Sequence, residues 1–158
     1  EARNQTEVLD VAQLLLAGDV TVVGTAAVDV EVGSGDVDVR DVPGTVAVDT
    51  GSGQVRLTNL AGTSTVHTSS GSIRGESLRG PVSASASSGD IALELARQHD
   101  VRAETSSGDV ELTVPAGRYR VDSNGDDDRG DIEVIDAPDA RFALELYTSS
   151  GDITVARR

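Results

Sequence analysis

The segment Thr105-Ser106-Ser107-Gly108-Asp109-Val110-Glu111-Leu112 contains a pattern that is repeated along most of the chain. At its centre a glycine is followed by a polar residue and then by valine or isoleucine. This triplet occurs eight times, beginning at Gly18, Gly35, Gly53, Gly71, Gly89, Gly108, Gly130 and Gly151. Successive glycines are 17, 18, 18, 18, 19, 22 and 21 residues apart. So constant a period indicates a repeat architecture in which equivalent residues stack on one another.

Each repeat predicts two short strands joined by two corners. After the glycine, Val37 and Val39 alternate with Asp38, which is typical of a strand with one buried face. A second alternating segment, such as 28–32, precedes a serine-rich corner and the next glycine. Glycine suits this corner because it accepts a positive φ, and serine and aspartate can hydrogen-bond to the corner backbone.

The sequence therefore predicts an all-β fold, a parallel β-helix (β-solenoid) of about eight coils of 17–22 residues around a thin aliphatic interior. An antiparallel sandwich of eight hairpins would also account for the strands, but it gives no reason for the constant period. We expect a single domain, with the solenoid over residues 18–158. Residues 1–17 form either a strand, with Val11 and Leu15 at inward spacing, or a helical cap; the strand is favoured.

The composition excludes several classes of protein. The 158 residues include 27 acidic and 13 basic residues, all of the latter arginine, and the net charge of −14 disfavours nucleic acid and anionic lipid as partners. The absence of cysteine excludes disulfides and thiolate metal sites. No apolar run approaches the length of a membrane span. Because the chain contains no methionine, we expect a signal peptide or anchor to have been removed upstream of Glu1.

The phrase Thr-Ser-Ser-Gly-Asp, found at 105–109 and at 148–152, resembles the bacterial adhesin-like family of β-strand-repeat proteins. Residues 114–122 are similar to its actinobacterial members. The resemblance extends over nearly the whole chain from Gly18. It implies a right-handed β-solenoid displayed outside the cytoplasmic membrane, and it supplies no catalytic residues.

The 22-residue repeat contains an acidic insertion with the spacing of a calcium-binding loop. Oxygen ligands fall at positions 1, 3, 5, 7 and 12 of an EF-hand-like loop, namely Asp122, Asn124, Asp126, Asp128 and Glu133. However, Asp127 stands where such loops have a turn glycine, and the flanking segments predict strands rather than helices. The alternative interpretation is a solvated acidic loop at a solenoid corner. Apart from Ca²⁺ at this loop, no cofactor is expected.

The aspartates that follow the corner glycines form a column, which predicts corner caps in preference to a ladder of cation sites. Its members are Asp19, Asp36, Asp90, Asp109, Asp131 and Asp152. Gln54 and Ser72 interrupt the column. In the same region, residues 52–79 hold a single acid, Glu76, against three arginines, and residues 63–72 are a candidate contact surface without charge.

No arrangement of catalytic residues is predicted, because the serines lie at corners, His67 is expected to face solvent and His99 falls in a turn. We therefore expect a non-enzymatic, extracytoplasmic binding or adhesion-type scaffold that presents a rigid acidic surface to a protein or cell-envelope component. Two alternatives remain: a structural solenoid that forms homo-oligomers or filaments through its open ends, and a Ca²⁺-dependent surface-binding module.

Overall fold

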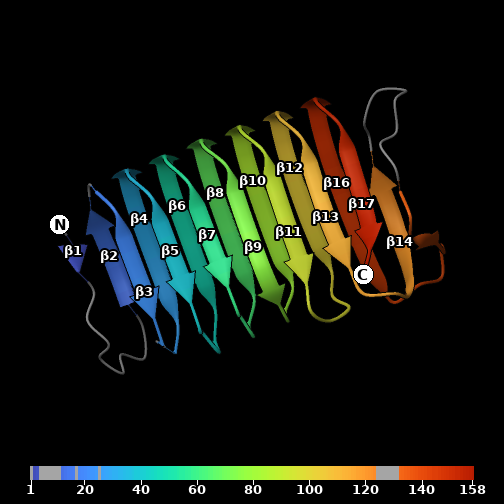
Figure 1. The fold of residues 1–158 in the computed structure, drawn as a ribbon, viewed down its shortest axis with the longest axis horizontal. Coiled ribbons are helices and arrows are strands. Elements are labelled where there is room, and N and C mark those ends of the chain that lie inside the picture. The colour runs from blue at the N-terminus through green and yellow to red at the C-terminus, as the bar shows by residue number, and fades with distance from the viewer. Residues whose placement is uncertain (1, 4–11, 17, 25, 124–131) are drawn as a thin grey trace.

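The computed structural model describes residues 2–3, 12–16, 18–24, 26–123 and 132–158, in which all regular structure is β-strand (Figure 1). The strands form two parallel sheets. The eight-stranded sheet contains, in spatial order, β1 (Ala2–Arg3), β3 (Val20–Val23), β5 (Val37–Arg40), β7 (Val55–Thr58), β9 (Ile73–Leu78), β11 (Ile91–Leu95), β13 (Val110–Val114) and β17 (Ile153–Arg157). The nine-stranded sheet contains β15 (Ile135–Asp136), β14 (Arg118–Ser123), β16 (Phe142–Ser150), β12 (Val101–Ser107), β10 (Val82–Ser88), β8 (Ser64–Ser70), β6 (Val46–Ser52), β4 (Val28–Ser34) and β2 (Ala12–Leu16).

The chain alternates between the two sheets, so that each coil adds one strand to each of them. Every pairing between named strands is parallel, and equivalent residues pair directly, as in Val37 with Val55 and Val55 with Ile73. The predicted all-β parallel solenoid is thereby confirmed, with about six turns.

The predicted count of about eight coils is too high because the last coil is much longer than the others. The Asp152 N–H bonds to Asp109, 43 residues earlier, whereas the equivalent bond from Gln54 to Asp36 spans 18 residues. Strand β16, not β14, pairs with β12, and β14 and β15 lie outside β16. The reason is chemical: β16 carries the Leu144, Leu146 and Thr148 pattern that continues the inward columns of β12.

The coil expected at Gly130 is therefore not a separate turn of the solenoid. Gly130 and Asp131 lie outside the described residues. The next residue, Ile132, is half-buried and makes a single parallel bridge to Val155. The glycine column of the described structure thus passes from Gly108 directly to Gly151, where the Gly108 N–H donates to the Ser150 carbonyl at 2.9 Å.

The N-terminal segment is strand at residues 2–3 and 12–16. Its register differs by one residue from the predicted spacing. Leu14 pairs with Val30 and Leu15 pairs with Glu31, whereas the sequence suggested Leu15 as the inward position. The preceding residue of the predicted pair, Val11, lies outside the described residues.

The interior is one column of aliphatic side chains per inward strand position, as the alternation predicted. The residues two beyond each described column glycine are all buried: Val20, Val37, Val55, Ile73, Ile91, Val110 and Ile153. The only aromatic residue among the buried core is Tyr119 of β14, which is fully enclosed and donates its hydroxyl hydrogen to the Pro115 carbonyl at 2.9 Å. Such a thin interior needs few large side chains, which accounts for the low aromatic content.

Candidate functional site

Aspartate side chains connect successive coils at the glycine corner, the turn that leads from the nine-stranded to the eight-stranded sheet. In each case Oδ1 of one coil accepts the backbone N–H of the equivalent residue in the next coil. These bonds run from Asp36 to Asp19 (3.0 Å), Gln54 to Asp36 (2.9 Å), Asp109 to Asp90 (3.1 Å) and Asp152 to Asp109 (2.9 Å). The predicted corner-capping role is confirmed for Asp19, Asp36, Asp90 and Asp109, whereas Asp131 lies outside the described residues. We call Asp19, Asp36, Asp90, Asp109 and Asp152 the aspartate row.

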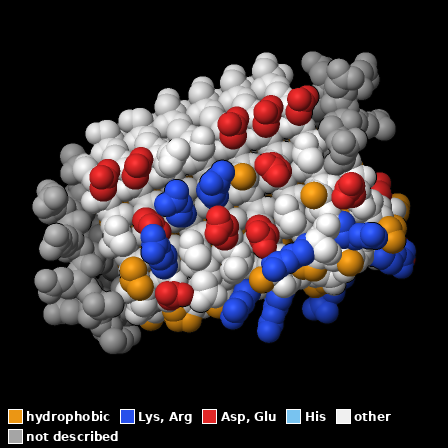
Figure 2. Space-filling model, in the orientation of Figure 1, with side chains coloured by type: hydrophobic (Ala, Val, Ile, Leu, Met, Phe, Trp, Pro, Cys, Tyr) orange, Lys and Arg blue, Asp and Glu red, His pale blue; other side chains and the backbone are white. Residues whose placement is uncertain are grey.

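The aspartate row is interrupted at two successive coils. Gln54 and Ser72 stand where the other coils have aspartate, and Figure 2 shows the acidic side chains along this edge in two separate groups. Neither side chain accepts the N–H of the next coil. Among the residues that the structure describes, the N–H groups of Ser72 and Asp90 consequently have no hydrogen-bond acceptor.

Two arginines lie side by side just below this interruption. Arg56 of β7 and Arg74 of β9 are exposed and pair directly in the parallel register. Like charges placed opposite each other on neighbouring strands destabilise a sheet. No salt bridge within the described residues involves either arginine.

The nearest acidic neighbour in register is already occupied by another arginine. Asp38 pairs with Arg56 across β5 and β7, but its Oδ1 accepts from Nε of Arg40 at 2.9 Å, and a second bond joins Oδ2 to the Arg40 guanidinium. The hydrogen bond and the charge of Asp38 raise the pKa of Arg40. On the other side of Arg74 the register position is Ala92, which is too short to fill the surface.

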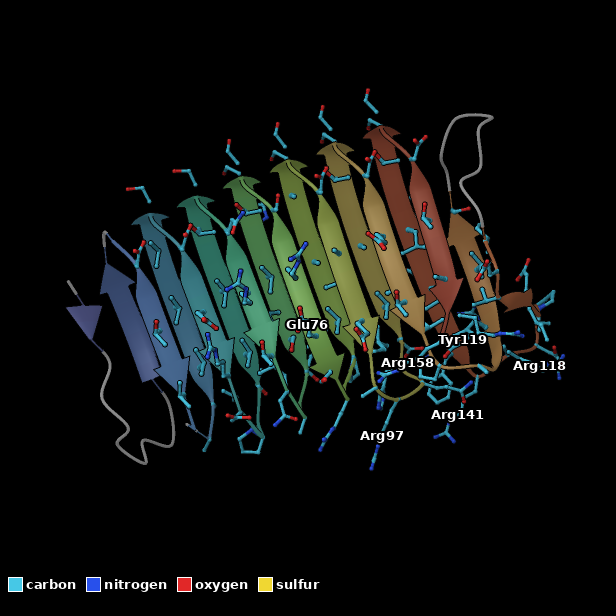
Figure 3. All side chains as sticks on the ribbon, viewed as in Figure 1. Glu76, Arg97, Arg118, Tyr119, Arg141 and Arg158 are labelled. Atoms are coloured by element: carbon cyan, nitrogen blue, oxygen red, sulfur yellow. The ribbon has the colours of Figure 1, made fainter. Side chains whose placement is uncertain are left out.

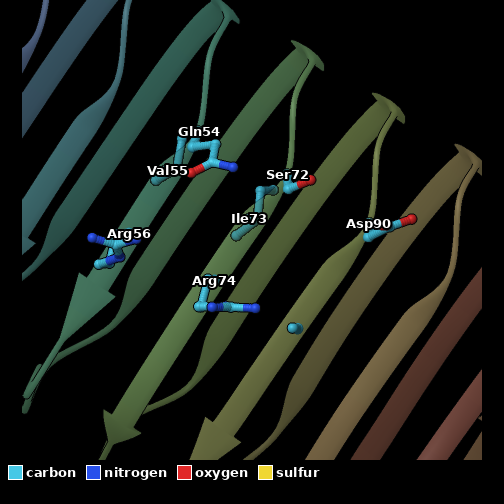
Figure 4. A pocket seen from close by; sticks show the side chains of 8 residues that line it. Gln54, Val55, Arg56, Ser72, Ile73, Arg74 and Asp90 are labelled. Carbon is cyan, nitrogen blue, oxygen red and sulfur yellow. The ribbon is translucent and has the colours of Figure 1, made fainter.

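These features enclose a hollow of about 160 Å³ on the eight-stranded sheet (Figure 4). Gln54, Ser72 and Asp90 lie along its corner side, and Arg56 and Arg74 lie on the strands beside it. Two of its polar groups, the guanidinium groups of Arg56 and Arg74, only donate hydrogen bonds, and the Gln54 amide and the Ser72 hydroxyl can each donate or accept. The only carboxylate that lines it is that of Asp90.

A larger hollow, of about 330 Å³, lies on the nine-stranded sheet between β10, β12 and β16. Arg102, Arg120 and Arg141 line it around Pro81 and Val82. Arg102 is partly neutralised by Glu145 at 3.4 Å and Glu104 at 3.6 Å. This hollow could not be predicted from the sequence, because it depends on the placement of β16 beside β12 across 43 residues.

Further arginines project from the same end of the solenoid, at the corner opposite the glycine corner. Figure 3 shows Arg97, Arg118, Arg141 and Arg158 extending outward there. Arg118 bonds to Asp139 at 2.6 Å and Arg158 bonds to Glu94 at 2.6 Å. The negative net charge of the chain is therefore unevenly distributed over its surface.

The predicted calcium loop falls mostly outside the described residues, which exclude Asn124, Asp126 and Asp128. Asp122 lies at the end of β14, in register with Glu145, and the carboxylate of the exposed Glu133 accepts the Arg157 N–H at 3.5 Å. No group of three or more potential ligands occurs among the described residues. Calcium binding by this loop stays a prediction.

The two histidines occupy separate environments. His67 is exposed on β8 next to buried Val66, as predicted. His99 is half-buried at the arginine-bearing corner, where its ring contacts that of Phe142 edge to face with centroids 6.0 Å apart. Within the predicted contact segment 63–72, Thr65, His67 and Ser69 are exposed, whereas Ser64 and Thr68 are buried.

The fold and its surface define the class of this molecule as a two-sheet parallel β-solenoid domain with charged rows on its corners. A family model described as Toastrack DUF4097 matches residues 5–156, and the chain belongs to this family, a domain of unknown function with β-repeat architecture. No curated protein and no solved structure matches the chain. No helix in the described part of the chain is long and apolar enough to span a membrane.

Proposed function

We propose that this Toastrack domain is a non-enzymatic, extracytoplasmic scaffold that presents a rigid acidic surface for adhesion-type contacts with a protein or another cell-envelope component. The observation that supports this function most strongly is the aspartate row. Four of its five carboxylates, those of Asp19, Asp36, Asp90 and Asp109, accept a backbone N–H from the next coil, and strands in a sheet are about 4.8 Å apart. The row is therefore a set of negative charges at fixed positions.

Fixed side chains favour binding because little conformational entropy remains to be lost when a partner docks. The net charge of −14 adds long-range attraction for a partner with a basic surface. Solvent-facing acids on the nine-stranded sheet, including Asp29, Glu31 and Asp49, add to that charge but make no hydrogen bond or salt bridge within the described residues. They provide a comparison for the row.

The test is to remove three charges from the row while keeping its hydrogen bonds. Asparagine retains an acceptor oxygen, so the combination Asp36→Asn, Asp90→Asn and Asp109→Asn should preserve the corner. We expect this variant to bind an isolated bacterial cell-envelope fraction at least tenfold more weakly than the wild-type domain in a co-sedimentation assay. Equal loss in a control with the same change of charge would show that only net charge matters; its substitutions are Asp29→Asn, Glu31→Gln and Asp49→Asn. Absence of binding by the wild-type domain would contradict the proposed function.

Self-assembly is a second candidate function because one end of the nine-stranded sheet presents an apolar side chain. β15 is the outermost strand there, and its Ile135 is 59% exposed, the only large hydrophobic residue so exposed among the described residues. An unpaired strand edge can template pairing with another chain. Sedimentation velocity over a wide range of concentrations separates the two functions, since a scaffold that acts alone remains monomeric.

A further inference from the structure

We propose that the interruption of the aspartate row is a binding site for a carboxylate group carried by the partner. The site consists of the Ser72 and Asp90 N–H groups, the side chains of Gln54 and Ser72, and the guanidinium groups of Arg56 and Arg74. The inference deepens the proposed function and rests on it for the identity of the partner, but the site itself can be tested with small ligands.

The interruption lacks the carboxylate that the rest of the row supplies. Where the row is intact, a carboxylate oxygen accepts the corner N–H of the next coil at 2.9–3.1 Å. At Ser72 and Asp90 that acceptor is missing, while the backbone follows the same glycine corner, with Gly71 and Gly89 at φ values of 146° and 135°. An external carboxylate placed there would accept the same kind of bond.

Two positively charged side chains, those of Arg56 and Arg74, lie next to the interruption. Arg56 and Arg74 are adjacent in register, make no salt bridge among the described residues, and line the same hollow as the unpaired corner. A guanidinium group bonds a carboxylate through two parallel N–H donors, and charge-assisted bonds of this kind are stronger than neutral ones. A bound carboxylate would also relieve the repulsion between the two arginines.

A partner that docks along the glycine corner would contact two groups of aspartates separated by the interruption. Asp19 and Asp36 lie on one side of the interruption, and Asp90, Asp109 and Asp152 lie on the other. A partner could place basic side chains opposite the aspartates on both sides. Its charges would be complementary along the whole row only if it also placed a carboxylate opposite the interruption. Such alternation of charge specifies the register of docking, which a uniform acidic row cannot do.

The test is an NMR titration of the ¹⁵N-labelled domain with glutarate, a small dicarboxylate, at constant low ionic strength. We expect saturable shifts of the Ser72 and Asp90 amide signals with a millimolar dissociation constant. The double variant Arg56→Gln, Arg74→Gln should weaken this binding at least tenfold. The double variant Gln54→Asp, Ser72→Asp, which supplies the missing carboxylates covalently, should abolish it. The matched control Arg102→Gln, Arg120→Gln, which removes the same two charges from the other sheet, should bind as the wild-type domain does.

Three outcomes would overturn the proposal. Amide shifts that are absent or do not saturate would show that the hollow does not bind a carboxylate. Unchanged affinity in the Arg56→Gln, Arg74→Gln variant, whose amide spectrum also reports whether it is folded, would remove the role of the arginines. Tighter saturation by inorganic phosphate than by glutarate would assign the site to a phosphate group instead. If glutarate does not bind but the domain still binds the envelope fraction, the carboxylate site is wrong and the scaffold function is retained. If glutarate binds but the envelope fraction does not, the site is retained and the scaffold function is wrong.

Discussion

Replacement of Gly71 by alanine is expected to destabilise the domain by about 2–6 kcal/mol. Gly71 has a φ of 146°, a backbone conformation that costs a residue other than glycine about 1–3 kcal/mol. A β-carbon at this position would also overlap the carbonyl oxygen of Gly53 in the preceding coil, and such overpacking costs about 1–3 kcal/mol. Because every coil meets its neighbour in the same way, neither coil can move without disturbing the next one.

Three other glycines separate the two contributions. Gly18 has a φ of 109°, but no atom of the described residues lies within 4 Å of the β-carbon that it lacks, so Gly18→Ala should cost only the backbone term. Gly51 has no positive φ, but a β-carbon there would meet the Gly33 carbonyl oxygen, so Gly51→Ala should cost only the steric term. Gly33 has no positive φ and no neighbour within 4 Å of an added β-carbon among the described residues, and Gly33→Ala should be close to neutral. Unfolding in urea followed by circular dichroism gives the four free energies; equal values for all four variants would refute coil-on-coil contact at the corner.

The second large effect is expected for Tyr119→Ala, which should lower the free energy of unfolding by about 3–5 kcal/mol. The ring is fully buried at the end of the solenoid where β14 covers β16, and its removal would leave a cavity that the surrounding backbone cannot close. Tyr119→Phe removes only the hydroxyl bond to Pro115, so it should cost about 1 kcal/mol. The same urea measurement checks both variants, and a similar loss in both would mean that the hydroxyl, not the ring, stabilises this end.

The same residue predicts a pH dependence. Burial raises the pKa of the Tyr119 phenol, and its contact with Gln98 opposes this shift in part. Because the folded pKa exceeds the unfolded value, the stabilising contribution is complete below a pH of about 10 and is lost as the pH rises through the folded pKa. Tyr119→Phe should therefore lose less stability than the wild-type domain above that pH, although it is the less stable protein at neutral pH.

Most of the fold could be predicted from the sequence because the repeat is translational. The alternation of Val37, Asp38 and Val39 sets which face is buried, and a constant period sets which residues pair. Prediction failed where the period failed. The triplet at Gly130 matches the repeat locally, but the choice of β16 as the neighbour of β12 depends on how well a whole strand continues the inward columns, which no local motif expresses.

Only part of the candidate site could be predicted from the sequence. Arg56 and Arg74 are 18 residues apart, one period, so the sequence already places them side by side below Gln54 and Ser72. Two features required the structure. The pairing of Asp38 with Arg40 depends on side-chain conformation, and the unpaired N–H groups of Ser72 and Asp90 become evident only when the other coils show their aspartate bonds.

If identical corners join interchangeable coils, the solenoid should tolerate the removal of one whole coil. Deletion of residues 36–53, one 18-residue period, joins Gly35 to Gln54 and restores the same corner, with Asp19 in place to accept the Gln54 N–H. Deletion of residues 36–44 removes half a period and places strand β6 where β5 should begin. In thermal unfolding followed by circular dichroism, we expect a single cooperative transition with nearly the full loss of β-sheet signal for the first variant. For the second variant we expect a smaller loss of β-sheet signal, because the coils before the deletion can no longer stack on those after it. Loss of the transition in the full-period deletion, or an equal signal change in the two variants, would contradict the interchange of coils.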